Sequence, residues 1–125
     1  MSLAFPKLTR WKNKKYLEWI RKQPCVITGF YGCEPHHAIG LKLSGMGLTA
    51  PDWAVMPVTR GSHNFIHATP SVKNQQWKWI TQTLQAAYIA GVIDIDPDTT
   101  FTDNDRYPNH WEAQARAIGE AIENA

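Results

Sequence analysis

The sequence predicts an α+β fold in which a small β-hairpin and a short helix are packed by additional flanking helices. Apolar residues recur with helical spacing near both ends of the chain, whereas residues 25–39 hold short apolar runs separated by glycines. The chain has 125 residues, 43% hydrophobic and 19% charged, which suits one compact domain with a core of its own. We therefore expect a single domain over residues 1–125.

The first expected element is a helix over residues 9–22, because Trp11, Trp19 and Ile20 fall near one face and Pro24 follows. Residues 25–28 form a short strand candidate, and a turn rich in glycine and aromatic residues comes next. Extended structure resumes at residues 34–39. Residues 25–39 therefore suggest a β-hairpin, which the glycine-rich loop at residues 40–50 follows.

The second half of the chain is expected to be mainly helical. Residues 52–58 are apolar and suggest a second extended piece that stops at Pro57, and a short helix follows at residues 59–67. The clearest helical pattern ends at Gly91. A Pro/Asp/Thr-rich connection over 94–109 precedes the last helix. The expected organisation is a motif core at about residues 24–70 with flanking helices at 9–22, 73–91 and 109–123.

Charge is distributed unevenly. Residues 1–22 carry seven basic residues against Glu18, a net charge of +6, whereas residues 92–125 carry eight acidic residues against two arginines, a net charge of −6. Basic and aromatic residues interleaved in this way are typical of surfaces that follow a phosphate backbone. The solvated lysine face of an amphipathic helix explains the pattern equally well. The candidate phosphate contacts are Lys12, Lys14, Lys15, Lys42 and Arg60.

Four of the five histidines stand in two short stretches, EPHHAIG at residues 34–40 and SHNFIH at residues 62–67. His63 and His67 are four residues apart, so on a helix they project from the same face and can bind one metal ion. The adjacent pair can complete that site, because neighbouring side chains of an extended segment point to opposite faces. One histidine can face the metal while the other acts as a base on a water molecule. Surface or capping histidines are the alternative for each stretch taken alone.

These features resemble the His-Asn-His (HNH, or ββα-metal) endonuclease superfamily, and most closely small phage nucleases of the recombination-enhancement (Ref) type. The resemblance covers roughly residues 17–93 and rests on PC at 24–25, PHHAIG at 35–40, GMG at 45–47, Asp52, Pro57 and the SHNFIH helix. It implies a metal-dependent hydrolase that cleaves DNA, is encoded by a phage or prophage, and takes part in recombination or DNA processing. A recombinase filament is a further partner that it implies.

The resemblance also implies a role for each matching residue. His36, His63 and His67 would hold one divalent ion (Zn²⁺, Mg²⁺, Mn²⁺ or Ni²⁺), and His37 would be the general base. Asp52 stands near the middle position of the motif, where the residue braces the loop behind the base. We expect Asp52 to give structural support.

The sequence departs from the family at a second metal site. Many relatives carry two Cys-x-x-Cys pairs that bind a structural zinc, but the matching positions here are Cys25, Thr28, Thr59 and Ser62. Hydroxyl groups are poor zinc ligands, and Cys33 alone does not complete a site. We therefore expect no second, structural zinc.

No apolar run approaches the roughly 20 residues of a membrane span, and no secretory signal pattern is present. We therefore expect a cytoplasmic protein, located in the bacterial host if it is phage encoded. We predict a metal-dependent DNA endonuclease. The alternatives are a non-catalytic nucleic-acid-binding module stabilised by the metal, and a phage interaction protein. Oligomeric state and the preferred DNA structure stay open.

Overall fold

The computed structural model describes residues 11–43, 50–94 and 110–123. It shows an α+β domain with a two-stranded antiparallel sheet and several helices. The element order is α1 (Lys14–Arg21), β1 (Glu34–His37), the 3₁₀-helix η1 (Asp52–Ala54), β2 (Val55–Val58), α2 (Arg60–Ala68), the 3₁₀-helix η2 (Pro70–Gln75), α3 (Gln76–Ile89) and α5 (His110–Glu123). No described helix is both long and apolar enough to cross a membrane.

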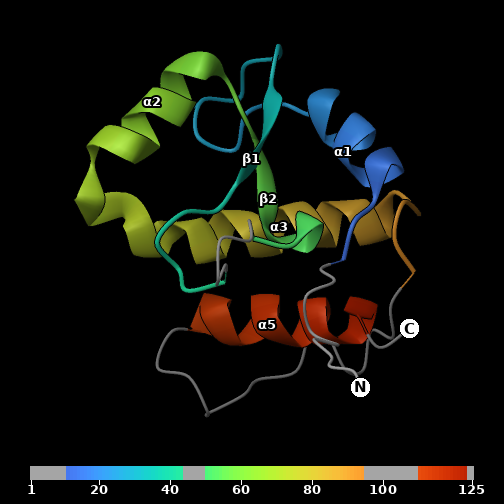
Figure 1. Ribbon diagram of the computed structural model, residues 1–125. Helices are drawn as coiled ribbons and strands as arrows, with labels where there is room; N and C mark the ends of the chain where they lie inside the picture. The colour runs from blue at the N-terminus through green and yellow to red at the C-terminus, as the bar shows by residue number, and fades with distance from the viewer. Residues whose placement is uncertain (1–10, 44–49, 95–109, 124–125) are drawn as a thin grey trace, which may run out of the picture.

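The sheet lies between α1 and α2, α3 runs beneath it, and α5 lies beneath α3 (Figure 1). All four residues of β2 are buried, because α3 covers this strand. The core continues from β2 into Ile80 and Leu84 of α3 and Ile118 of α5, all of which are fully buried. A methyl group at Gly119 would overlap the Trp53 ring, so glycine lets α5 approach η1 closely. The outer helices thus supply most of the core against which the small sheet packs.

The expected hairpin over residues 25–39 is wrong. β1 pairs with β2, with Glu34 opposite Val58 and His37 opposite Val55. Residues 26–28 form a turn, which the bond from Gly29 N–H to the Cys25 carbonyl closes at 2.8 Å. The turn still lies beside the sheet, since Val26 N–H donates to the Pro57 carbonyl at 3.0 Å. The short apolar run at 25–28 therefore reflects packing against β2 and not strand pairing.

The first helix begins later than expected, at Lys14 instead of residue 9, and residues 11–13 are not helical. Asn13 is extended, and its side chain caps the helix by accepting a hydrogen bond from Tyr16 N–H at 3.0 Å. The Asn13 N–H donates to Asp52 Oδ2 at 2.8 Å, so a residue far along the chain holds the cap in place. The start of α1 is therefore set by a tertiary contact.

The remaining helices agree with their expected positions to within a few residues. Thr59 caps α2, because its hydroxyl accepts from Ser62 N–H at 3.3 Å. Gly91 follows α3 with φ of 76°, a left-handed conformation that favours glycine after a helix. The second extended piece was expected to stop at Pro57, but β2 continues to Val58. The connection at residues 95–109 and the loop at 44–49 lie outside the described residues.

Candidate metal centre and histidine base

The structure brings together the three histidines that the sequence proposes as metal ligands. His36 comes from β1, and His63 and His67 come from α2. One nitrogen from each ring lies within 4.8 Å of the other two, and no other such group of His, Cys, Asp or Glu occurs among the described residues. The Nδ1 atoms of His36 and His63 are 3.2 Å apart. Two imidazole nitrogens bound to one tetrahedral zinc are about 3.3–3.4 Å apart, given Zn–N bonds of about 2.0–2.1 Å.

Local structure explains this convergence. His63 and His67 lie one turn apart on α2, so their rings stack with centroids 4.5 Å apart. His36 is the buried residue of β1, with only 3% of its surface exposed, and its ring meets those of His63 and His67 edge-on. We call His36, His63 and His67 the histidine cluster.

Burial favours the neutral, metal-binding form of His36 and His63. Burial, followed by the neighbouring charges of His63, His67 and His37, lowers the pKa of His36 to about 4. Burial and His67 also lower the pKa of His63, while Glu34 opposes the shift. His36 is therefore neutral at pH 7 and has a free nitrogen lone pair.

The donor set fits a divalent ion. Nδ1 of His36 faces Nδ1 of His63, so this is the nitrogen that an ion held between the rings would bind. Nε2 lies on the other side of the His36 ring, is buried, and has no hydrogen-bond partner among the described residues, so it would not be the ligand atom of such an ion. Three imidazoles suit zinc and several other divalent metals.

His37 points away from the cluster, to Asp52. His37 Nε2 and Asp52 Oδ1 are 2.9 Å apart, and the Asp52 residue is only 3% exposed. Its other oxygen, Oδ2, accepts from Asn13 N–H at 2.8 Å, so the carboxylate is held from both ends. Because an ionised carboxylate only accepts hydrogen bonds, His37 Nε2 carries the proton and Nδ1 is left able to accept one. The His37 side chain is 32% exposed, which leaves it open to water.

Glu34 is a site residue that the sequence reasoning missed. Its Oε1 lies 3.3 Å from His63 Nδ1, and its Oε2 accepts from Arg60 Nη2 at 3.0 Å. Strand alternation could have identified Glu34, since residues 34 and 36 of an extended strand lie on the same face. Glu34 thus joins the histidine cluster to the first turn of α2.

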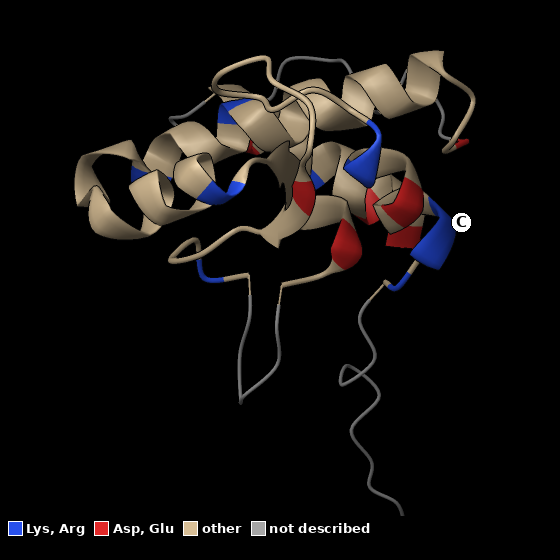
Figure 2. Cartoon of the chain, turned by 90° about the horizontal axis from the view of Figure 1, so that it is seen from above, with Lys and Arg blue, Asp and Glu red and all other residues tan. Residues whose placement is uncertain are grey.

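The proposed phosphate contacts are exposed but do not form one surface. Lys12 and Lys14 flank Asn13 and so lie near the Asp52–His37 pair, and Lys15 follows them on α1. Lys42 is exposed with φ of 62°, and Arg60 begins α2 on the other side of the sheet. Figure 2 shows the lysine and arginine positions spread over several elements, some of them beside acidic positions.

The four positions that match a structural zinc site in relatives also come together. Cys25 Sγ lies 3.3 Å from Ser62 Oγ, and Thr59 Oγ1 donates to the same oxygen at 3.2 Å. Thr28 also bonds Cys25. Burial alone would raise the pKa of Cys25, but its hydrogen bonds with Ser62 and Thr28 outweigh burial and lower the pKa to about 6. We call Cys25, Thr28, Thr59 and Ser62 the hydroxyl cluster.

The second cysteine lies next to the hydroxyl cluster. Cys33 Sγ donates to the Phe30 carbonyl at 3.5 Å, and the N–H of Cys25 donates to the same oxygen at 2.8 Å. Burial and the neighbouring Cys25 raise the pKa of Cys33. Both cysteines are free thiols.

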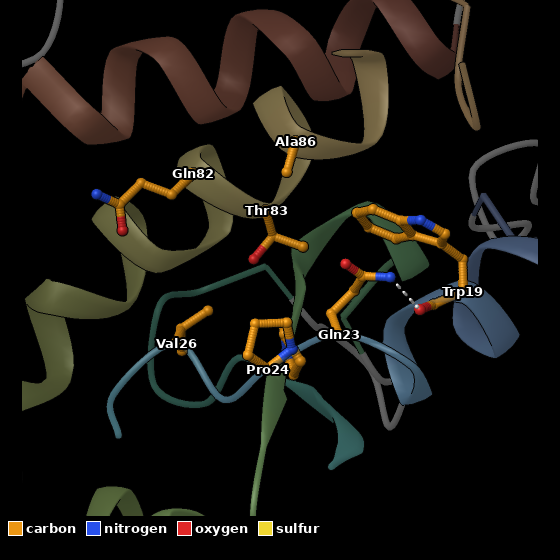
Figure 3. A pocket seen from close by; sticks show the side chains of 8 residues that line it. Trp19, Gln23, Pro24, Val26, Gln82, Thr83 and Ala86 are labelled. Carbon is orange, nitrogen blue, oxygen red and sulfur yellow. Dashed lines mark hydrogen bonds between the residues drawn. The ribbon is translucent and has the colours of Figure 1, made fainter. Parts of the chain in front are cut away.

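An apolar pocket lies away from the histidines, between the end of α1 and α3. In Figure 3, Thr83 and Ala86 of α3 face Trp19 and Gln23 across it. Gln23 Nε2 donates to the Trp19 carbonyl at 3.0 Å, which closes one side. No charged side chain lines this pocket, so it does not suit a phosphate group.

Comparisons with known proteins give few matches. A family model described as "Protein of unknown function (DUF968)" matches residues 1–91. A protein of Escherichia coli (strain K12), called "Uncharacterized protein YdfU", is 42% identical over 65 residues. This match covers 52% of the chain and 19% of the relative, so the chain matches about a fifth of that protein's length. No solved structure matches.

Proposed function

This chain belongs to the DUF968 family, whose function is unknown, and from the geometry of its site we propose that it is a metal-dependent endonuclease of the HNH type that hydrolyses DNA phosphodiester bonds. One observation carries the proposal. Two adjacent histidines of β1 point in different directions, His36 into a cluster of three imidazoles and His37 to a buried carboxylate. A purely structural metal site needs only the first arrangement, whereas the second orients an imidazole that is open to water.

The order of elements supports the same proposal. β1, β2 and α2 follow one another as two strands and a helix, with one proposed ligand on β1 and two on α2. The hydroxyl cluster adds independent support, because four positions matched to the HNH superfamily by sequence alone meet in space. Their convergence is expected if this chain shares the ββα core of the HNH superfamily and has lost the second metal site of that core.

Each residue then has a role in hydrolysis. His36, His63 and His67 would hold the ion, which supplies positive charge to polarise the phosphate and to stabilise the departing 3′ oxygen. His37 Nδ1 takes a proton from the attacking water, while Asp52 keeps the proton of the ring on Nε2. Glu34 holds His63 and Arg60 in place. The DNA substrate and the link to recombination follow from the family resemblance.

A nicking assay on supercoiled DNA tests the proposal. Purified protein is incubated with Mg²⁺, Mn²⁺ or Zn²⁺, with EDTA as the metal-free control, and is compared with His37→Ala and His36→Ala. We expect His37→Ala to lose about 10²–10⁴-fold in rate, because it lacks the general base, and to bind the ion as the parent does. We expect His36→Ala to lose both cleavage and metal affinity.

A His37→Ala protein that cuts DNA as fast as its parent would rule out the base assignment. A parent protein that binds the ion and DNA but never cuts would favour the non-catalytic binding module. Neutralising Lys12, Lys14 and Lys15 together tests the basic segment at the start of α1. If it contacts DNA, the dependence of affinity on salt flattens by about one unit of slope for each lost phosphate contact.

A further inference from the structure

The loop between Gly29 and Gly32 presents two aromatic side chains to solvent. Phe30 is 70% exposed and Tyr31 is 72% exposed. The other exposed large hydrophobic residues of the described chain are Phe65 and Ile89, which lie on separate helices. We call residues 29–32 the aromatic loop.

The backbone of the aromatic loop is fixed although its side chains are free. Gly29 and Gly32 have φ of 79° and 92°, so a glycine at each end permits the turn. The Phe30 carbonyl accepts from Cys25 N–H at 2.8 Å, and Phe30 N–H donates to Thr28 Oγ1 at 3.3 Å. The fold therefore holds the two rings outward without burying them, although burial would stabilise it.

The aromatic loop is connected to the proposed catalytic site on two sides. Cys25, which anchors the loop, contacts Ser62, and Ser62 directly precedes His63 on α2. The chain also passes from Gly32 through Cys33 into β1, which carries Glu34 and His36. The aromatic loop is thus joined directly to the elements that carry the proposed ligands.

The segment that carries the aromatic loop has no charge of its own. Positions 23 to 33 hold no charged residue, and the nearest charged residues in the sequence are the exposed Lys22 on one side and Glu34 on the other. Glu34 is paired with Arg60, whose side chain is 71% exposed. Two exposed rings on an uncharged segment suit nucleobases, which stack on aromatic side chains whatever their sequence. They make a poor protein interface, which needs about 800 Å² from each partner.

We propose that the aromatic loop is a nucleobase-stacking site and that the preferred substrate is DNA with unpaired bases near the cleavage point. The proposal rests on the proposed nuclease function and adds the substrate class. Bases in a regular duplex are stacked on one another and cannot lie against Phe30 and Tyr31. Single strands, flaps and branch points have bases free to do so.

Equilibrium binding to oligonucleotides tests the proposal without requiring cleavage. Labelled single-stranded, flapped and duplex DNA of the same sequence are titrated with the parent, with a Phe30→Ala/Tyr31→Ala double variant, and with Ile89→Ala. Ile89 is 84% exposed at the end of α3, so it controls for the loss of an exposed apolar side chain. We expect the double variant to bind single-stranded and flapped DNA about 10- to 100-fold more weakly and duplex DNA within about threefold of the parent. Ile89→Ala should bind every substrate as the parent does.

Equal weakening on all three substrates would overturn the proposal, because it would point to backbone contacts or misfolding. Unchanged affinity would also overturn it and would leave a protein as the partner of the loop. Thermal unfolding of the double variant should match that of the parent, since the two rings are not part of the core.

The binding assay also separates the nuclease hypothesis from the stacking-site hypothesis. A protein that prefers unpaired bases through this loop but never cuts would refute the nuclease function alone, and a nuclease whose DNA binding ignores the loop would refute the stacking site alone.

Discussion

The histidine cluster and the hydroxyl cluster are built from the same parts of the chain but differ in how their polar groups are satisfied. Both join α2 to the segment between α1 and the end of β1. In the hydroxyl cluster, Ser62 bonds both Cys25 and Thr59, so the groups satisfy one another. In the histidine cluster, Nδ1 of His36 faces only Nδ1 of His63, His36 Nε2 has no partner among the residues described, and burial and neighbouring imidazoles lower the pKa of His36 and His63.

The difference favours the histidine cluster over the hydroxyl cluster as the metal site of the proposed function. Hydroxyl groups donate and accept, so a closed set of them can replace a metal as the link between two elements. A neutral imidazole also has one donor and one acceptor, but its nitrogen lone pair binds a divalent cation far better than a hydroxyl group does. Under the proposed function, the fold would keep one metal site and would replace the other with hydrogen bonds.

The strongest way to break this comparison is to turn the hydroxyl cluster back into a metal site. In a Thr28→Cys/Thr59→Cys/Ser62→Cys variant, four thiols would stand where one stands now. We expect this variant to bind one more Zn²⁺ or Co²⁺ per chain than the parent, with a binding free energy on the order of 10 kcal/mol. Metal analysis and the thiolate absorption of bound Co²⁺ measure it. Adding Cys25→Ala should abolish the extra site, and an unchanged metal content would show that the four positions do not form a tetrahedral set.

Acid should destabilise the metal-free protein through the histidine cluster. The pKa of His36 is about 4 in the folded chain against 6.5 for an ordinary histidine, so between these values the unfolded chain binds more protons. The free energy of unfolding should therefore fall as the pH drops from about 6.5 to 4, by about 3 kcal/mol from His36 alone. Urea unfolding in EDTA at several pH values measures the loss. His36→Gln should flatten the dependence, and an equally steep curve in that variant would assign the loss to other groups.

Replacing the carboxylate behind His37 should affect catalysis more than folding. Asp52→Asn keeps an oxygen for the Asn13 N–H but presents no negative charge to His37. We expect the cleavage rate to fall about 10- to 100-fold, as for other residues that orient a catalytic imidazole or a metal ligand. Metal affinity, measured by calorimetry, should stay within a few-fold of the parent. A large loss of metal affinity instead would place Asp52 in the support of the histidine cluster.

The smallest expected effect comes from the cap of α2. Thr59→Ala removes the hydroxyl that accepts from Ser62 N–H and donates to Ser62 Oγ, and we expect it to cost about 1 kcal/mol of stability. Thr59→Ser keeps the hydroxyl and should restore most of the loss in denaturant unfolding. Metal affinity should be the same in both variants. If metal affinity fell together with stability in Thr59→Ala, the hydroxyl cluster and the histidine cluster would not be independent of each other.

Local signals in the sequence were enough for the parts of the site that lie on one element. The spacing of His63 and His67, with Thr59 as a helix cap, places two imidazoles on one face of α2. The strand alternation that separates His36 from His37 is equally local. The same rule applied to Glu34 would have added it to the site.

Local sequence patterns did not predict the partner strand of β1 or the first residue of α1, because each depends on residues far apart in the chain. A strand of four residues carries little local information about its partner. β1 pairs with Val55–Val58, the strand that α3 buries. In the same way, helical periodicity extends before residue 14, but Asp52 holds Asn13 in an extended conformation and delays the helix. The sequence by itself determined which side chains are able to bind a metal or move a proton. Only the tertiary structure decided which of them meet, because hydrogen bonds and burial between distant segments choose among pairings that local propensity leaves nearly equal.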